Sequence, residues 1–177
     1  MGRDKGLLKE EAQTWAEIAA RKFAALQLPV VISVNRQQAG TYGQIFSPEQ
    51  LITDDERFNA KAPLFGLLSV HLQIGDDLFV LACDIRDMTA SLMQDLLDSY
   101  QQGSHEAYIY QTGEKPQPLC GIYRAGGLER IYSLFQQGKL KRFSMMHVLE
   151  LLHTKSILVP DEALPAFNNY NSLDQVE

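Results

Sequence analysis

The feature that most constrains this chain is its alternation of doubly buried strands with amphipathic helices. Residues 29–35 read Pro-Val-Val-Ile-Ser-Val-Asn and residues 78–83 read Leu-Phe-Val-Leu-Ala-Cys, so both runs are almost continuously apolar. Strands of this kind are covered on both faces, as in parallel sheets packed between helices. The alternation therefore predicts an α/β fold, a three-layer α/β/α sandwich with a Rossmann-like, mostly parallel sheet.

Hydrophobic periodicity places the remaining elements along the chain. Thr14 and Glu17 have the spacing of a capping box, which favours a helix that begins there. A polar run follows the strand that ends at Asn35. The pattern predicts helices over 14–28, from 63 to about 72, over 92–100, over 128–138 and from 144, with strands over 106–111, 119–124 and 156–159.

Length and charge limit the classes of protein to which this chain can belong. Its 177 residues favour a single domain over 1–177, and the formal net charge is −6. An acidic chain is a poor sequence-independent nucleic-acid binder, because such proteins need a basic face; the densest basic run, 139–142, is best explained as a solvated face. No uncharged apolar run approaches about 18 residues, and Cys83 and Cys120 lie in apolar runs, so we expect a cytoplasmic protein without a membrane partner.

Two polar residues end the buried strands and are the first candidates for a site. In α/β sheets, ligands bind beyond the carboxyl ends of the strands, which is where Asn35 and Asp84 are expected. An aspartate there can hold Mg²⁺ beside phosphate oxygens. The alternative for Asp84 is a cap on the helix that begins near Thr89, or closure of a turn.

Asp54 and Lys5 are weaker candidates from their positions alone. Asp54 ends a shorter apolar stretch, where a solvated turn residue is the simpler interpretation. Lys5 lies near small residues and could reach a phosphate chain, although a lysine near a terminus is usually just solvated. The four histidines show no zinc-ligand spacing, and the chain carries no G-x-S-x-G, Walker A or G-x-G-x-x-G sequence.

Seven short segments, each at an expected strand end or helix start, occur in an order that is more specific than any one of them. Taken together they resemble the molybdenum cofactor guanylyltransferases, which have the nucleotidyltransferase fold of the nucleotide-diphospho-sugar transferase type. The resemblance runs from residue 1 to about residue 174. The segments are Met1–Leu8, Ser33–Arg36, Ile52–Asp54, Ala62–Gly66, Leu81–Asp84, Gln117–Tyr123 and Phe167–Ser172.

The resemblance implies transfer of GMP from GTP to the phosphate of molybdopterin or Mo-molybdopterin, with release of pyrophosphate and dependence on Mg²⁺. It assigns Lys5 to the nucleotide phosphates, Asn35 and Asp54 to nucleotide binding, and Asp84 to the magnesium ion. Asn169 and Asn171 match a late asparagine motif that borders the active site, on the acceptor side. Further expected partners are molybdenum-insertion proteins and apo-molybdoenzymes. No protein nucleophile is needed for such a transfer, so we expect Cys83 to be a packing residue.

The sequence also departs from the family pattern. The family begins with a strand and a glycine-rich L-x-G-G-x-S-x-R loop that wraps the nucleotide, whereas this sequence starts at the Met-Gly that follows them. We expect the full protein to carry that strand and loop; the alternative is a shortened product with impaired function. Residues 85–87 stand where a proline is common, and residues 59–62 where glycines are usual.

Three functions therefore stay open at this point. The first is a guanylyltransferase that acts on molybdopterin. The second is a related nucleotidyltransferase that uses CTP or another acceptor phosphate, because the glycine-rich loop would hold much of the base-selecting information. The third is a non-catalytic paralogue that binds the cofactor.

Overall fold

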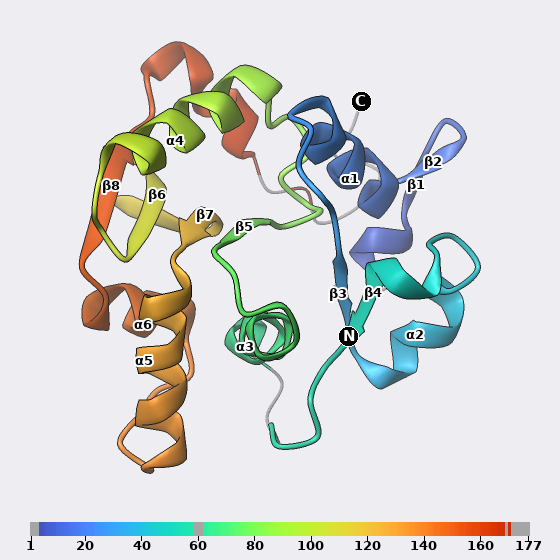
Figure 1. The fold of residues 1–177 in the computed structure, drawn as a ribbon. Coiled ribbons are helices and arrows are strands. Elements are labelled where there is room, and N and C mark those ends of the chain that lie inside the picture. The colour runs from blue at the N-terminus through green and yellow to red at the C-terminus, as the bar shows by residue number, and fades with distance from the viewer. Residues whose placement is uncertain (1–3, 59–61, 169, 171–177) are drawn as a thin grey trace.

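The elements alternate along the chain in the computed structural model, which describes residues 4–58, 62–168 and 170 (Figure 1). The strands are β1 (Lys9–Glu10), β2 (Gln13–Thr14), β3 (Ile32–Val34), β4 (Leu51–Thr53), β5 (Leu78–Leu81), β6 (Ala107–Thr112), β7 (Lys115–Tyr123) and β8 (Thr154–Leu158). The α-helices are α1 (Trp15–Ala25), α2 (Arg36–Tyr42), α3 (Pro63–Ile74), α4 (Ala90–Gln102), α5 (Ala125–Gln136) and α6 (Met145–Leu151), and the 3₁₀ helices are η1 (Lys5–Leu7), η2 (Pro48–Gln50) and η3 (Asp161–Phe167).

Two groups of strands form the middle of the molecule. One sheet has the order β5-β7-β6-β8, in which β7 runs antiparallel to β5 and β6 while β6 and β8 are parallel. β5, β6 and β8 therefore share one direction and β7 alone is reversed. β3 and β4 form a separate parallel pair, with Ile32 opposite Leu51. The α/β class predicted from the alternation is confirmed.

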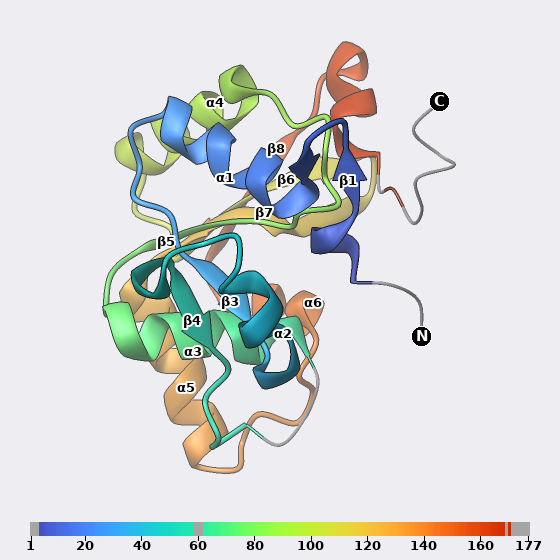
Figure 2. The same cartoon turned by 90° about the vertical axis from the view of Figure 1, so that its right-hand side faces the viewer.

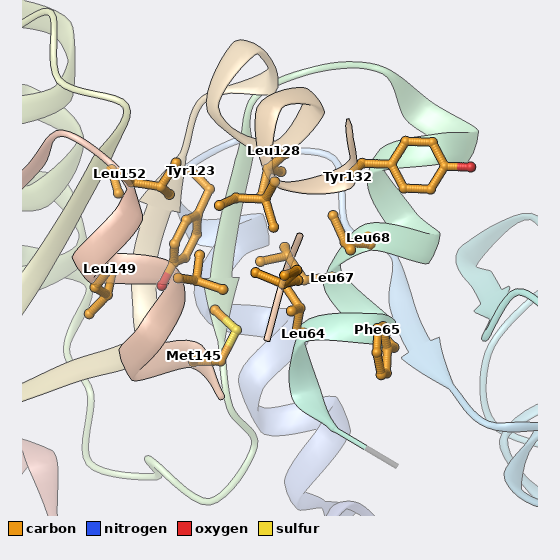
Figure 3. Close-up of a cluster of buried hydrophobic side chains, with 14 of the residues drawn as sticks. Leu64, Phe65, Leu67, Leu68, Tyr123, Leu128, Tyr132, Met145, Leu149 and Leu152 are labelled. Atoms are coloured by element: carbon orange, nitrogen blue, oxygen red, sulfur yellow. The ribbon is translucent and has the colours of Figure 1, made fainter. Parts of the chain in front are cut away.

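Helices cover both faces of the larger sheet (Figure 2). On one face, α3, α5 and α6 enclose a cluster in which Leu64, Leu128 and Val148 are fully buried (Figure 3). On the other face, α4 contributes Met93, and α1 adds partly buried side chains. β6 is buried over Ala107–Tyr110, but the double burial predicted for the runs 29–35 and 78–83 is not found: β3 and β5 are only partly buried, because both line a cavity. Among the described residues, no helix is long and apolar enough to cross a membrane.

Local signals explain where most helices begin. The Thr14 hydroxyl accepts from the Glu17 amide and the Glu17 carboxylate accepts from the Thr14 amide, so the predicted capping box is present. α1 ends at Ala25, three residues before the predicted end. Ser144 caps α6 through the His147 amide. Thr89 caps α4 through the Leu92 amide, so the alternative that Asp84 caps this helix is wrong.

The sequence analysis predicts no helix over residues 36–43, but α2 lies there. The run Arg36–Tyr42 lacks an apolar stripe, so periodicity gives no helical signal. The helix is instead started by a capping box between Asn35 and Gln38. That spacing is visible in the sequence and could have predicted the helix.

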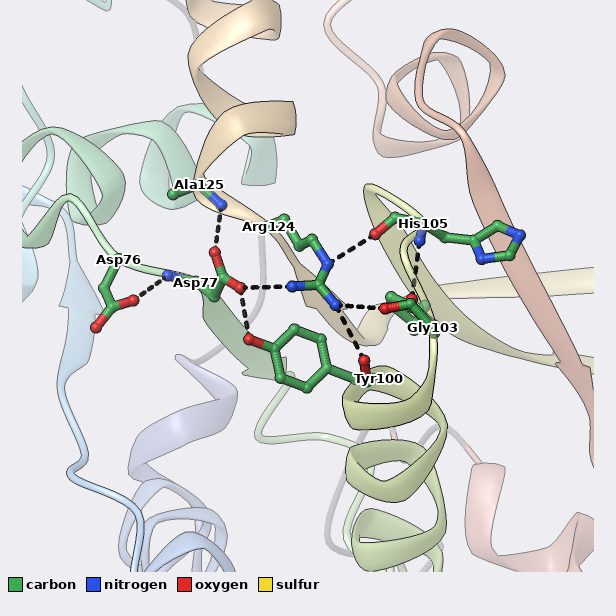
Figure 4. Close-up of polar contacts among 8 residues, drawn as sticks. Asp76, Asp77, Tyr100, Gly103, His105, Arg124 and Ala125 are labelled. Atoms are coloured by element: carbon green, nitrogen blue, oxygen red, sulfur yellow. Dashed lines mark hydrogen bonds and ion pairs between the residues drawn. The ribbon is translucent and has the colours of Figure 1, made fainter.

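A polar cluster fixes the amino end of β5 (Figure 4). The Asp77 carboxylate accepts hydrogen bonds from the Ala125 amide at 2.7 Å and from the Tyr100 hydroxyl at 2.5 Å. The Arg124 guanidinium contacts Asp77 and donates to the carbonyls of Tyr100, Gly103 and His105. β5 is thereby tied to the end of α4 and the start of α5.

Candidate active site

A cavity of about 1370 Å³ runs between β3 and β5 and is lined by α1 and α3. Asn35, Asp54 and Asp84, which follow β3, β4 and β5, all line it. The carboxyl ends of these three strands therefore meet at one end of the cavity, as the rule for α/β sheets predicts. In the described part of the chain, β3 pairs only with β4, and β5 pairs only with β7 (Figure 1).

Lys5 forms an ion pair with the Asp84 carboxylate at the cavity. Its Nζ donates to Asp84 Oδ2 at 2.9 Å, with side chains 36% and 21% exposed, respectively. The two residues are 79 positions apart in sequence. The structure thus brings together the two residues that the resemblance assigns to nucleotide phosphates and metal. Both side chains are partly exposed, so the Lys5 ammonium remains accessible to an anionic ligand beside the Asp84 carboxylate.

A hydrogen-bond network connects this ion pair to α2. Asp4 Oδ1 accepts from the Tyr42 hydroxyl at 3.1 Å and from the Gly6 amide at 3.0 Å, and its Oδ2 accepts from Gln38 Nε2 at 2.6 Å. A Cβ on Gly6 would lie 2.1 Å from the Tyr42 hydroxyl oxygen, so a larger residue there would displace the hydroxyl that donates to Asp4. Asp4 therefore fixes the turn that presents Lys5. The sequence analysis does not identify this role of Asp4, Gln38 and Tyr42.

Asn35 has a structural role besides the one the resemblance assigns to it. Its Oδ1 accepts from the amides of Gln37 at 2.9 Å and Gln38 at 3.0 Å. The side-chain oxygen is thus used to cap α2, and the amide Nδ2 is the group that can donate to a ligand. The sequence analysis does not predict this capping role.

Asp54 and Asp55 have opposite electrostatic environments. Burial raises the pKa of Asp54, which lines the cavity. The pKa of Asp55 is lowered to about 2, mainly by hydrogen bonds from the Arg57 side chain. The Asp55 amide also donates to Ser69 Oγ at 2.8 Å, which fixes the loop on α3. Both residues line the cavity, but the Asp55 carboxylate is held by Arg57, so Asp54 is the stronger candidate for binding a ligand.

The chemistry of the donors fits a hard divalent cation at Asp84. Mg²⁺ takes oxygen ligands and is usually held by one or two carboxylates together with substrate phosphates and water. Among residues 4–58, 62–168 and 170, no group of three or more His, Cys, Asp or Glu is arranged to hold a metal. Burial raises the pKa of the adjacent Cys83 thiol to about 11, so it stays protonated at neutral pH, which suits the packing role predicted for it.

The late asparagines, Asn169 and Asn171, lie outside the described residues. Tyr170 between them is described, and its amide donates to the Asp84 carbonyl at 3.4 Å. Its hydroxyl donates to Asp87. Tyr170 therefore contacts the turn that carries Asp84, although the sequence analysis does not single it out.

Comparisons with known proteins agree with this geometry. Residues 1–151 match the family model of the MobA-like NTP transferase domain. A probable molybdenum cofactor guanylyltransferase from Geobacillus sp. (strain WCH70) is 27% identical over 136 residues, which are 76% of this chain and 69% of that protein.

Solved structures show the same fold at low sequence identity. Molybdopterin-guanine dinucleotide biosynthesis protein A from Archaeoglobus fulgidus matches with a TM-score of 0.78 at 18% identity, over 99% of this chain and 88% of that one. A 4-diphosphocytidyl-2C-methyl-D-erythritol synthase from Anaerococcus prevotii matches with a TM-score of 0.75 at 7% identity, over 98% and 90%. On the family match, which covers residues 1–151, this chain belongs to the MobA-like NTP transferases and is a nucleotidyltransferase.

Proposed function

We propose that this protein transfers GMP from GTP to the phosphate of molybdopterin or Mo-molybdopterin, with Mg²⁺ as the metal. The observation that carries the proposal is the Lys5–Asp84 pair at the end of the cavity that Asn35 and Asp54 also line. The name of the Geobacillus relative and that of the Archaeoglobus protein support the same substrates. Molybdenum-insertion proteins and apo-molybdoenzymes stay predicted partners.

The reaction places its main demand on charge neutralisation and positioning. An oxygen of the acceptor phosphate forms a bond to the α-phosphorus of GTP while the bond to the bridging oxygen breaks, and pyrophosphate leaves with that electron pair. Lys5 supplies positive charge where the pyrophosphate develops. Asp84 would hold Mg²⁺, which neutralises phosphate oxygens when bound. No protein nucleophile takes part, in agreement with the protonated Cys83 thiol.

Asn35 and Asp54 bind the nucleoside in this proposal. Asn35 donates from Nδ2, because its Oδ1 is already occupied by the α2 amides. Asp54 accepts hydrogen bonds from hydroxyl or amino groups, which also offset the burial of its carboxylate.

The direct test supplies the purified protein and Mg²⁺ with molybdopterin and, in turn, GTP, CTP, ATP or UTP, and measures pyrophosphate. We expect release with GTP only. Release with CTP alone replaces the guanylyl assignment with the cytidylyl one. Binding of molybdopterin without release from any nucleotide supports the non-catalytic paralogue.

Asp84→Ala is expected to lower the Mg²⁺-dependent rate at least about 10³-fold, and unchanged activity would refute its assignment.

We also propose that the cavity between β3 and β5 accommodates the strand that the family resemblance places before Met1. Apolar side chains of both helical layers line it, including Phe23 from α1 and Leu67 from α3. A strand parallel to β3 and β5 would leave the cavity at its carboxyl end, where Asp4 and Lys5 lie. Its glycine-rich loop would then add backbone N–H donors for the phosphates.

A further inference from the structure

Arg86 is a buried cation two residues after Asp84, and it has no role in the reaction proposed above. Its side chain is only 6% exposed. It forms an ion pair with Glu10 in β1, and its backbone carbonyl accepts from the Lys22 ammonium of α1. The turn after β5 is thereby joined to the amino-terminal hairpin and to α1, beside which it runs (Figure 2).

Two aromatic rings hold the Arg86 guanidinium. Its Cζ lies 5.0 Å from the ring centroid of Trp15, which is fully buried at the start of α1, and 5.2 Å from that of Tyr170. A planar guanidinium can contact two rings and a carboxylate at once, which the compact lysine ammonium cannot do. The site therefore selects arginine by shape as well as by charge.

This arrangement is a poor device for stability alone. The Glu10 side chain is 40% exposed, so its ion pair with Arg86 is screened by solvent and offsets little of the cost of burying the guanidinium. In addition, the buried Arg86 Nε has no hydrogen-bond partner among the described residues, and an unpaired buried donor costs free energy. What the arrangement does achieve is a fixed position for the turn, because elements from both ends of the chain converge on Arg86.

That turn carries Asp84. The Ile85 amide closes it onto the Ala82 carbonyl at 3.1 Å, and the Tyr170 amide contacts the Asp84 carbonyl at 3.4 Å. Asp84 is thus fixed by neighbours on its own backbone, while its carboxylate stays directed to Lys5. We propose that Arg86 is a positioning residue that holds Asp84 in the geometry needed for the metal and the phosphates, an inference that rests on the proposed function.

The fold provides a matched control at the other end of β5. Arg124 also contacts an aspartate, and it stacks on the Tyr100 ring at 4.3 Å (Figure 4). Arg124 is the N-cap residue of α5 and contacts Asp77 just before β5, so Arg124→Met removes an aromatic-stacked arginine at the end of β5 opposite Asp84. Because Arg124 donates to three backbone carbonyls and the Arg86 side chain donates to Glu10, a general loss of stability should affect Arg124→Met at least as strongly as Arg86→Met.

The experiment compares wild type, Arg86→Met, Arg86→Lys and Arg124→Met by two measurements. Hydrogen–deuterium exchange follows the backbone amides of residues 82–88, and pyrophosphate release follows turnover against Mg²⁺ concentration. We expect Arg86→Met to speed exchange in 82–88 at least about tenfold and to raise the half-saturating Mg²⁺ concentration about 10- to 100-fold. We expect Arg124→Met to leave both near wild type, and Arg86→Lys to fall between.

Equal exchange of residues 82–88 in Arg86→Met and Arg124→Met would overturn the inference. Unchanged Mg²⁺ dependence in an active Arg86→Met protein would overturn it as well. If Arg86→Met does not fold, Arg86→Lys carries the same comparison. If wild type transfers no nucleotide at all, the proposed function fails, and the exchange measurement still decides whether Arg86 holds the turn.

Discussion

Asp54 and Asp55 are adjacent and chemically identical, yet they differ in how they are used. Asp55 is satisfied by Arg57, whereas the Asp54 carboxylate is penalised by burial at the cavity. A carboxylate whose burial lowers the stability of the folded protein is a candidate functional residue, because it does not contribute to folding. The sequence places both at the end of an apolar stretch and cannot separate them, since the separation depends on which side chain Arg57 reaches.

Asp54→Asn should stabilise the protein at neutral pH. The folded-state pKa of Asp54 lies above the ordinary value of 3.8, so the folded protein binds this proton more tightly than the unfolded chain. Stability therefore falls as pH rises through that window, and removing the ionised group recovers it. We expect a higher Tm at pH 7, a gain that shrinks toward pH 4, and loss of nucleotide transfer.

Asp55→Asn is the control for that experiment and should behave in the opposite way. Its folded pKa is depressed to about 2, so its contribution is present above the unfolded value and is lost as pH falls. We expect a lower Tm at pH 7 and a smaller deficit in acid. Thermal melts from pH 2 to 8 cover the pH range in which the Asp55 contribution is lost and so distinguish the two variants; parallel behaviour would contradict the assignment.

Gly66 allows α3 to approach the site closely. A Cβ at this position would lie 2.8 Å from Ser33 Oγ and 3.5 Å from Asp54 Oδ1. Gly66→Ala should therefore displace the Ser33 side chain and fill the space beside the Asp54 carboxylate, and we expect it to weaken GTP binding about tenfold or more by calorimetry. Gly40→Ala in α2 meets nothing within 4 Å, so it should leave binding unchanged and stabilise the helix by up to about 1 kcal/mol. Equal GTP affinities would exclude this packing constraint.

At the scale of elements, hydrophobic periodicity predicts the apolar strands and amphipathic helices, whereas a polar helix such as α2 can be predicted only from its capping residues. α3 and β5 are found where their apolar residues predict them. α2 was missed because its signal is a cap rather than a stripe. For the site, the strand-end rule identifies Asn35 and Asp84, but the contact of Lys5 with Asp84 depends on a turn that Asp4 fixes through α2, and no local pattern encodes that contact.

The Asp77–Arg124 cluster is expected to stabilise the elements around β5. Arg124→Met removes hydrogen bonds to three backbone carbonyls and leaves the Asp77 carboxylate with one cation fewer. We expect a loss of about 2 kcal/mol in the free energy of unfolding, measured by urea denaturation. Arg142→Met removes an exposed ion pair with Glu150 and should change little. Similar losses in the free energy of unfolding for both variants would show that the Asp77–Arg124 cluster contributes no more than an exposed ion pair.

At the scale of the molecule, the cavity between β3 and β5 separates two groups of strands, the β3–β4 pair and the four-stranded sheet. The helices that line the cavity, α1 and α3, connect the two groups. β3 and β4 join the small cluster of Ala16, Val34 and Tyr42, whereas β5 belongs to the larger sheet. Unpaired strand edges beside apolar side chains are costly in water. A strand between β3 and β5 would pair with both of their open edges and merge the two groups of strands into one sheet. We therefore expect the proposed strand to stabilise the whole fold.

An added strand tests that proposal directly. We would fuse five β-branched apolar residues and a glycine-rich loop ahead of Met1, with a second version that carries proline at the central strand position. The first should raise Tm by about 5–10 °C and reduce fluorescence of the apolar-surface dye ANS, because it buries the cavity lining and pairs both edges. The proline version cannot donate at its centre and should gain much less. Equal increases in Tm for the two versions would mean that the added segment binds through nonspecific hydrophobic contact rather than as a paired strand. No increase from either version would refute the proposal that a strand occupies this cavity.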